Sequence, residues 1–401
     1  MENVSTQQAA STPETSTAAP TLRLGVLGKS RKPDERRAPI HPEHLSRIEP
    51  ELRAQMVFEE GYGERFGMSD DVLATLVGTV ATREQVIAQA DVVLLPKPQA
   101  EDLAELKDGQ ILWGWPHCVQ DRAITQIAID KKLTLIAFEA MNHWTSDGWY
   151  SLHVFHMNNE MAGYSSVLHS LGLTGSTGHY GRRLKAVVIG FGATARGAVT
   201  ALKALGVPEV QVLTSRNVAA VASPIHSAEM VQFDFEETAP YKGFVMLDDG
   251  DVPLADFLAE SDIVVNCTLQ DPNAPMTYLT EADLSAFRPN SLIVDVSCDE
   301  GMGFSWARNT TFTEPMFTVG DNVNYYAVDH SPSYLWNSAT WEISEALMPF
   351  VEPLMAGRAV WADSDTITRA IEISEGVIIN PAILEFQHRQ ESYPHLPLAS
   401  A

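Results

Sequence analysis

Two cations and a histidine in the first third of the chain lie where a packed core has no need of them. Arg37 stands at a loop-to-helix junction, Lys97 lies between two prolines after the apolar stretch 91–95, and His117 follows the stretch 109–116. In open α/β sheets, ligands collect beyond the carboxyl ends of the strands. Two cations there can pair with a carboxylate, and an imidazole can exchange protons near neutral pH. The pattern therefore predicts a site that binds an oxo acid and polarises its carbonyl group.

Each of these side chains also has a purely structural interpretation. Arg37 has acidic neighbours and can be a surface charge, Lys97 can be a solvated turn residue, and His117 can be hydrogen-bonded to the backbone beside two tryptophans. His153 and His156 have a spacing that a metal site could use, but no third ligand is evident. The sequence therefore predicts no metal.

A glycine-rich turn, Gly190-Phe191-Gly192-Ala193-Thr194-Ala195, joins an apolar strand predicted at 186–189 to a helix predicted at 195–205. Gly190 permits a tight turn, Gly192 lets the backbone approach a pyrophosphate, and Ala195 is small enough for close helix–strand packing. The free N–H groups of the helix start favour an anion. An ordinary βα turn is the alternative, but the context favours a dinucleotide held by Gly190, Gly192, Ala193, Thr194 and Ala195.

The choice of cofactor depends on the end of the next strand, predicted at 210–213. A carboxylate in this region would bind ribose hydroxyls and repel a 2′-phosphate, whereas this chain has Thr214-Ser215-Arg216. Two hydroxyls and a guanidinium suit a phosphate, so NADP(H) is favoured over NAD(H). The alternative is that Arg216 stacks on adenine or faces water.

Both groups of residues need β-strands to position them. Apolar strands are predicted in two series, at 22–27, 55–59, 91–95, 110–113 and 133–138, and at 186–189, 210–213, 263–266 and 292–296. Helices are predicted from 42 onwards and at 83–89, 121–131, 160–173, 195–205 and 338–356. Strands alternating with helices indicate α/β layers with mainly parallel sheets. The glycine-rich stretch 172–181 precedes its strand and is predicted to be a loop.

The predicted fold is α/β, with two Rossmann-like domains, doubly wound parallel sheets and a cleft between them. The substrate domain is predicted to be discontinuous, formed by residues 22–155 and 325–401, with the NADP-binding domain at 156–324. Residues 1–21 are rich in Ser, Thr, Ala and Gln and are predicted to be a disordered tail.

Composition excludes several classes of function. The formal net charge of −25 over 401 residues argues against nucleic-acid and anionic-membrane partners. No apolar run has the roughly 18–20 residues of a membrane helix, and the first residues lack the features of a secretory signal. Three dispersed cysteines suggest neither a disulfide framework nor a CxxC metal site, so a cytoplasmic protein is expected.

The sequence resembles the alanine dehydrogenase and pyridine-nucleotide transhydrogenase family over about residues 22–350, and within it the opine-type branch of carboxyethylornithine synthase. The resemblance rests on several segments in order, at 35–44, 61–70, 109–117, 162–164 and 325–333, with 343–346 after them. The run Tyr325-Tyr326-Ala327-Val328-Asp329-His330-Ser331-Pro332-Ser333 is the most particular to the opine-type branch.

The resemblance implies roles for individual residues. It implies that Arg37 and Lys97 bind substrate and that His117 is the acid/base group. Asp299 matches an aspartate that dehydrogenase members of the family use, although the ornithine branch lacks an acid there; it can also be a turn or capping residue. The implied cofactor contacts are completed by Asn159, Thr268 and His330.

The implied reaction is NADPH-dependent reductive condensation of a pyruvate-like 2-oxo acid with an amino acid amine such as ornithine or lysine, an oxidoreductase reaction at a CH–NH group. Two alternatives stay open. One is an alanine-dehydrogenase-type enzyme that uses ammonia, and the other is a non-catalytic NADP(H)-binding sensor. Members of the family are homo-oligomers, so a homo-oligomer is expected.

Overall fold

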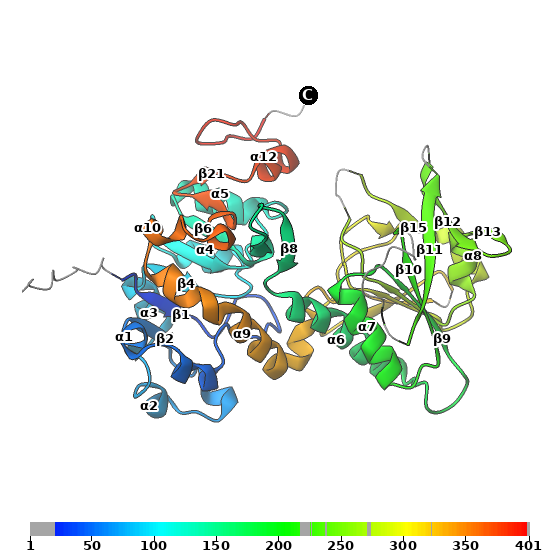
Figure 1. The fold of residues 1–401 in the computed structure, drawn as a ribbon, viewed down its shortest axis with the longest axis horizontal. Helices are drawn as coiled ribbons and strands as arrows, with labels where there is room; N and C mark the ends of the chain where they lie inside the picture. The colour runs from blue at the N-terminus through cyan, green and yellow to red at the C-terminus, as the bar shows by residue number, and fades with distance from the viewer. Residues whose placement is uncertain are drawn as a thin grey trace, which may run out of the picture.

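The computed structural model describes residues 21–216, 225, 227–236, 239–270, 274–321 and 323–398. The tail predicted at 1–21 lies, apart from Thr21, outside these residues. Figure 1 shows two α/β units side by side, with helices α6 (His156–Thr174) and α9 (Trp336–Met355) between them. No helix in the described ranges is both long and apolar enough to cross a membrane.

The first sheet contains eight strands within the described residues. Their order is β21 (Val377–Ile378), β20 (Ile371–Ser374), β6 (Thr134–Ala137), β5 (Ile111–Gly114), β4 (Val92–Leu94), β1 (Leu24–Val26), β2 (Met56–Glu59) and β3 (Thr79–Ala81). Strands β1 to β6 are parallel and follow the doubly wound order 3-2-1-4-5-6. Buried apolar runs such as β4 and β5 explain this, because parallel strands are covered on both faces.

The second sheet repeats this order. It runs β13 (Gly250–Pro253), β12 (Ala239–Leu247), β11 (Glu229–Glu236), β10 (Glu209–Thr214), β9 (Lys185–Ile189), β14 (Ile263–Asn266), β16 (Leu292–Asp295), β19 (Val323–Tyr326) and β18 (Met316–Val319). The six strands β11, β10, β9, β14, β16 and β19 are parallel to one another. The doubly wound α/β prediction is therefore confirmed, and the first sheet takes strands from both ends of the chain.

Helices and short ribbons complete the two units. In the first unit they are η1 (Pro42–Arg47), α1 (Pro50–Arg53), η2 (Glu64–Phe66), α2 (Asp70–Leu73), α3 (Arg83–Gln89), α4 (Ala100–Glu105), α5 (Arg122–Asp130), η3 (Phe138–Ala140), the hairpin β7 (Asn142–Trp144) and β8 (Tyr150–His153), α10 (Arg358–Trp361), α11 (Asp365–Thr368) and α12 (Pro381–Gln387). In the second they are α7 (Ala193–Ala204), α8 (Leu254–Ala259), η5 (Glu281–Ala286), the ribbon β15 (Thr277–Leu279) and β17 (Gly303–Phe304), and η6 (Ser331–Leu335) before α9.

The structure differs from the sequence prediction in three places. The helix predicted from residue 42 is the 3-10 helix η1, with His41 as its N-cap. The sheets are mainly parallel as predicted, but their antiparallel edge strands β12, β13, β18, β20 and β21 were not among the predicted strands. The predicted domain boundary at 324/325 falls inside β19, whose pairing with β16 keeps residues 323–326 in the second sheet.

Helix α6 lies directly against α7 because two glycines let the backbones approach. A Cβ added at Gly163 of α6 would overlap the carbonyl oxygen of Thr194, and one added at Gly197 of α7 would overlap that of Glu160. Gly172, near the end of α6, has no such neighbour within 4 Å. The contact between the link helix and the nucleotide unit therefore depends on the absence of two side chains.

This contact predicts opposite effects for two glycine-to-alanine substitutions in the same helix. Gly163→Ala forces α6 away from α7 and is expected to destabilise the protein by about 1–3 kcal/mol. Gly172→Ala adds a methyl group in open space and improves helix propensity, so it is expected to be neutral or to stabilise by up to about 1 kcal/mol. Urea unfolding of both variants measures the difference, and equal effects would contradict the packing argument.

Candidate active site

The loops after two neighbouring strands bring Lys97 and His117 together. Lys97 follows β4, His117 follows β5, and these strands pair in parallel, so their carboxyl ends lie at the same edge. Lys97 Nζ lies 2.9 Å from His117 Nε2. Burial lowers the pKa of His117 well below its usual range, and the charge of Lys97 lowers that pKa further. The imidazole therefore accepts a hydrogen bond from the ammonium group and can act as a base.

Arg37 is buried in the same unit, but its charge is already paired. Its Nε and NH2 groups donate to the two oxygens of Glu35 at 2.9 and 2.6 Å, and its NH1 group donates to Asn158 at 3.3 Å. Burial alone would raise the pKa of Glu35, but the charge of Arg37 and the hydrogen bonds from Arg37 and Ser333 together outweigh burial and bring that pKa to about 2. The guanidinium also lies over the Trp115 ring at 5.2 Å. Arg37 is not among the residues that line the cavity around Lys97 and His117, so direct pairing of Arg37 with a substrate stays a prediction.

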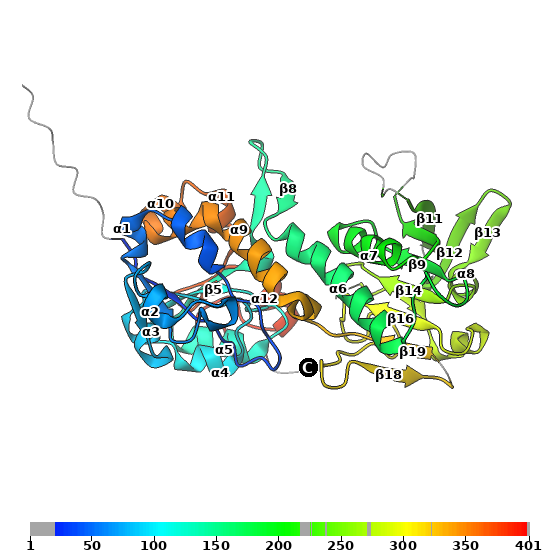
Figure 2. The ribbon, with the colours of Figure 1, turned by 90° about the horizontal axis from the view of Figure 1, so that it is seen from below.

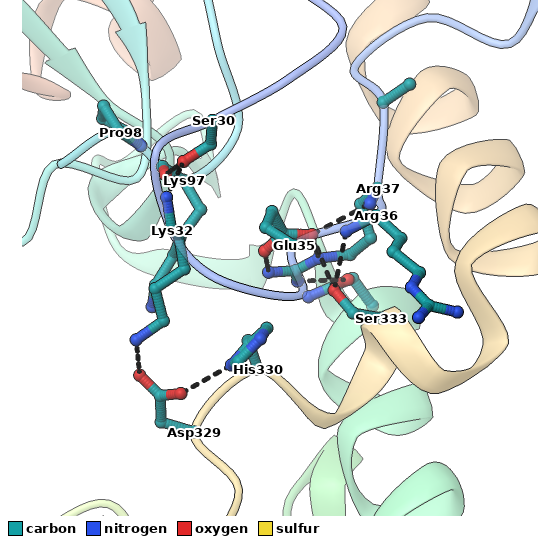
Figure 3. Close-up of polar contacts among 12 residues, drawn as sticks. Ser30, Lys32, Glu35, Arg36, Arg37, Lys97, Pro98, Asp329, His330 and Ser333 are labelled. Atoms are coloured by element: carbon teal, nitrogen blue, oxygen red, sulfur yellow. Dashed lines mark hydrogen bonds and ion pairs between the residues drawn. The ribbon is translucent and has the colours of Figure 1, made fainter. Parts of the chain in front are cut away.

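An ion pair that the sequence analysis missed joins the two units. Lys32 Nζ lies 2.7 Å from Asp329 Oδ2, while Asp329 Oδ1 lies 2.6 Å from His330 Nδ1 (Figure 3). Burial opposes ionisation of Asp329, but the hydrogen bond from His330 and the charges of Lys97 and Lys32 hold its pKa well below the usual range. Lys32 and Asp329 line the same cavity as Lys97 and His117, so this carboxylate is a fixed negative charge beside the histidine.

His330, predicted to contact the cofactor, is occupied elsewhere. Its ring is 3% exposed, and its Nε2 donates to the carbonyl oxygen of Pro33 at 3.1 Å while Nδ1 faces Asp329. Figure 3 shows it beside the loop that carries Lys32 and Glu35. The structure therefore places His330 between that loop and Asp329.

Asp299 reaches the cavity from the second unit. This cavity has a volume of about 580 Å³ and is lined by residues of both units, Asp299 and Lys97 among them. Burial raises the pKa of Asp299. Its loop is held by the buried carboxylate of Asp295, which accepts hydrogen bonds from Tyr325 at 2.6 Å and from the Cys298 backbone at 3.2 Å. The predicted catalytic pair His117 and Asp299 therefore shares one cavity with Lys97.

The glycine turn borders a second cavity of about 840 Å³. Gly190 has a φ of +112°, which only glycine adopts without strain, and a Cβ there would lie 3.0 Å from the Cys267 carbonyl oxygen. Gly192 is the N-cap of α7, and because it has no side chain, no side-chain capping bond is made at the start of this helix. A Cβ at Gly192 would meet no described atom within 4 Å, so the helix start faces open space. Backbone N–H groups facing open space at a helix start fit the pyrophosphate of a dinucleotide.

The remaining predicted cofactor residues line this cavity as well. They are Ala193, Thr194, Thr214, Ser215, Arg216, Thr268 and Asn159, and Ala195 lies buried beneath the turn. The hydroxyl of Thr214 accepts a bond from the Arg216 backbone at 3.1 Å, and the guanidinium of Arg216 lies 5.9 Å from the centre of the Phe191 ring. Asp234 of β11 also lines the cavity and was missed, because β11 falls outside the predicted strands.

The first unit closes the other side of this cavity. Asn142, Tyr150, His153 and His156 project there from the hairpin β7–β8 and the start of α6. Figure 2 shows the hairpin standing out from the first unit beside α6. Within the described residues no cluster of three or more His, Cys, Asp or Glu side chains is arranged to hold a metal, and His156 Nδ1 instead lies 3.3 Å from the His153 carbonyl.

Glu139 lines the cavity at the glycine turn and is hydrogen-bonded to His117, which lines the other cavity. Its Oε1 accepts the backbone N–H of His117 at 2.7 Å, and the same oxygen lies 4.0 Å from His117 Nδ1. Its Oε2 is buried and has no hydrogen-bond partner among the described residues. Burial, with the nearby charge of Glu372, raises the pKa of Glu139 to about 8. The carboxyl group beside the candidate base is therefore neutral at pH 7.

Comparison with known proteins gives a consistent result over both units. Residues 26–162 match the family model described as alanine dehydrogenase/PNT, N-terminal domain, and residues 170–381 match the C-terminal domain model of the same family. The chain is 26% identical over 343 residues to N(5)-(carboxyethyl)ornithine synthase of Clostridium botulinum, covering 82% of this chain and 94% of that protein. It is 25% identical over 380 residues to alanine dehydrogenase of Mycobacterium tuberculosis, covering 90% and 96%.

Solved structures share the fold. An L-alanine dehydrogenase matches with a TM-score of 0.72 at 19% identity, covering 91% of this chain and 99% of that one. A transhydrogenase from Sinorhizobium meliloti matches with a TM-score of 0.67 at 19% identity, covering 90% and 100%. At this identity the likeness concerns the fold alone.

Because Gly192 faces open space, we predict that a methyl group added there will weaken cofactor binding without affecting folding. Gly192→Ala has an ordinary φ of −76° and no clashing neighbour, so the thermal midpoint is expected to change little. The added methyl group blocks the approach of a pyrophosphate, and NADPH affinity, measured by fluorescence titration, is expected to fall at least about tenfold, or about 1.4 kcal/mol. Unchanged affinity would place the dinucleotide elsewhere.

The raised pKa of Glu139 predicts a specific dependence of stability on pH. An unfolded glutamate has a pKa of about 4.3, so between that pH and about 8 only the folded protein keeps the proton, and stability falls as the pH rises. The melting-temperature difference between Glu139→Gln and wild type is therefore expected to move in favour of the variant from pH 5 to pH 8.5.

Glu209 provides the control for this measurement. It is an exposed side chain at the start of β10, and its ion-pair partner is Arg183, which keeps its charge throughout the range from pH 5 to pH 8.5. The difference between Glu209→Gln and wild type is expected to stay constant over that range. A constant difference for Glu139→Gln as well would show that Glu139 is ionised at neutral pH.

Proposed function

Because the chain belongs to the alanine dehydrogenase/PNT family, we propose that it is an oxidoreductase that condenses a 2-oxo acid with the amine of an amino acid and reduces the product with NADPH. The observation that carries this proposal is the contact of 2.9 Å between Lys97 Nζ and His117 Nε2, in a cavity that Asp299 also lines. A cation, a base and an acid around one cavity are the groups that imine formation at a carbonyl carbon needs.

In the proposed reaction, a 2-oxo acid, an alkylammonium ion and NADPH, which supplies one hydride, are converted into an N-substituted amino acid, NADP⁺ and water. The amine must lose a proton before it attacks the carbonyl carbon, and the carbinolamine hydroxyl must gain one before it leaves as water. The nicotinamide, when bound, supplies the hydride that reduces the imine carbon.

The residues of the chain supply charge and proton transfer for these steps. Lys97 donates to the carbonyl oxygen of the oxo acid, and neutral His117 accepts the proton of the attacking amine. The same imidazole then returns the proton to the carbinolamine oxygen. Asp299 binds the positive charge of the amine from the opposite side of the cavity. Arg37 does not line this cavity, but its charge acts on His117, and we assign it an electrostatic contribution to binding of the carboxylate of the oxo acid.

We propose NADP(H) as the preferred cofactor, with NAD(H) second. Support comes from Ser215 and Arg216, which line the cavity beyond β10 at the place where a 2′-phosphate would lie. Arg196 of α7 lies over the same Phe191 ring, at 5.0 Å, so two guanidinium groups flank this ring. Asp234 is the one acidic side chain of the described lining at this end, and it opposes the effect of the arginines.

The test is a matrix of oxo acids against amines, with NADPH and NADH each as reductant. Wild type is expected to oxidise NADPH with pyruvate and ornithine or lysine faster than with pyruvate and ammonia. His117→Ala is expected to lose about 10²- to 10⁴-fold in kcat/KM while NADPH affinity is retained. His179→Ala, at an exposed histidine before β9, is the matched control and is expected to keep full activity.

Two outcomes would overturn the proposal. Turnover with ammonia alone would identify an alanine-dehydrogenase-type enzyme. A wild type that binds NADPH but is inert towards every oxo acid and amine would indicate a non-catalytic sensor.

A further inference from the structure

The cavity around Lys97 and His117 has an outer end that the proposed chemistry does not use. Its volume of about 580 Å³ lies within the range of about 300–1,000 Å³ typical of small-molecule sites and is far larger than a pyruvate-sized acid with ammonia requires. The outer lining residues are Gln99, Gln120, Asp121, Arg122 and Asn309. They come from the loops before α4 and α5 and, through Asn309, from the second unit, so a ligand here would contact both units.

The charges at the two ends of this cavity are balanced differently. At the inner end Lys32 is paired with Asp329, and Lys97 contacts His117. At the outer end, Arg122 has no ion pair or hydrogen bond to any described residue, although an acidic residue precedes it.

Asp121, the acidic residue before Arg122, caps helix α5 and does not pair with Arg122. The Asp121 carboxylate caps α5, accepting the N–H groups of Ala123 and Ile124 at 2.9 Å each. The charge of Arg122 lowers the pKa of Arg389, after the larger effect of burial, so a second guanidinium lies near Arg122 although it does not line this cavity. The outer end therefore presents an uncommitted cation in a chain whose net charge is −25.

We infer that the outer end binds the carboxylate of the amine donor, with Arg122 as its cationic partner and the side-chain amides of Gln99, Gln120 and Asn309 as further donors. A planar guanidinium binds a carboxylate through two parallel hydrogen bonds, which fixes the orientation of the ligand as well as its charge. The donor is then an amino acid that reacts through an amine distant from its carboxylate. Ammonia would contact none of these four residues. This inference rests on the proposed condensation reaction and names the residues that select its amine.

The experiment compares two amines that differ only in the carboxylate. Ornithine and putrescine have the same chain and a terminal amine, but putrescine lacks the carboxylate. With pyruvate and NADPH, wild type is expected to have a lower KM for ornithine than for putrescine. Arg122→Gln is expected to raise the KM for ornithine about tenfold, the effect of one charged hydrogen bond, and to leave the KM values for putrescine and pyruvate unchanged.

Two further variants separate this role from a structural one. Arg183→Gln removes an exposed arginine of the second unit, which pairs with Glu209, and is expected to change no KM. Arg122→Lys keeps the charge without the planar fork and is expected to lie between wild type and Arg122→Gln. Equal changes for ornithine and putrescine, or no change for either, would overturn the inference.

Calorimetric titration of ornithine and putrescine into the NADPH complex distinguishes failure of the inference from failure of the proposed reaction. Tighter binding of ornithine that is lost in Arg122→Gln supports the site even if no turnover is seen, in which case only the condensation reaction fails. Turnover with ornithine that is insensitive to Arg122 leaves the condensation standing and overturns the carboxylate site.

Discussion

Helix α6 can lie against α7 only because Gly163 and Gly197 carry no side chains, and much of the active-site geometry follows from this contact. The start of α6 belongs to the first unit, where Asn158 contacts Arg37 and Asn159 borders the dinucleotide cavity. The start of α7 is the glycine turn. Two packed helices with backbones in contact have little freedom to slide, so the proposed substrate side chains and the glycine turn are held in fixed positions relative to one another.

The electrostatics of the cleft complement this packing. Lys32 and Asp329 lie 297 residues apart in the chain, and their ion pair of 2.7 Å joins the loop after β1 to the segment after β19. Both side chains are about one-fifth exposed, so the pair is partly desolvated and is less screened by salt than a surface pair. It holds the two carboxyl-end edges together, and His330 extends the connection to the carbonyl of Pro33.

Local sequence patterns were sufficient for the central apolar strands of both sheets, the glycine turn and the approach of Lys97 to His117. Each depends on an apolar run followed by a loop, and neighbouring parallel strands end at one edge. The ion pair of Lys32 with Asp329 and the close approach at Gly163 and Gly197 depend on tertiary contacts that carry no local signal. The ion pair of Arg37 with Glu35 could have been predicted from the sequence, because Glu35 is only two residues away and an acid at that spacing can pair with an arginine. Asp234 was missed because β11 alternates between buried and exposed residues and is not marked by an apolar run.

The protonation states around His117 depend on one another. Were Glu139 ionised, its negative charge 4.0 Å from Nδ1 would favour an imidazolium ion and remove the base that the amine needs. Because burial keeps Glu139 protonated at neutral pH, the strongest charge facing the imidazole is that of Lys97, which favours the neutral ring. The fixed charge of Asp329 acts in the opposite direction, but it is shared among Lys32, Lys97 and His330. A histidine that is neutral at rest, and that has a cation as its hydrogen-bond donor, can accept a proton only when a substrate oxygen takes over that donor. In the proposed reaction, proton transfer is thereby coupled to binding of the carbonyl group.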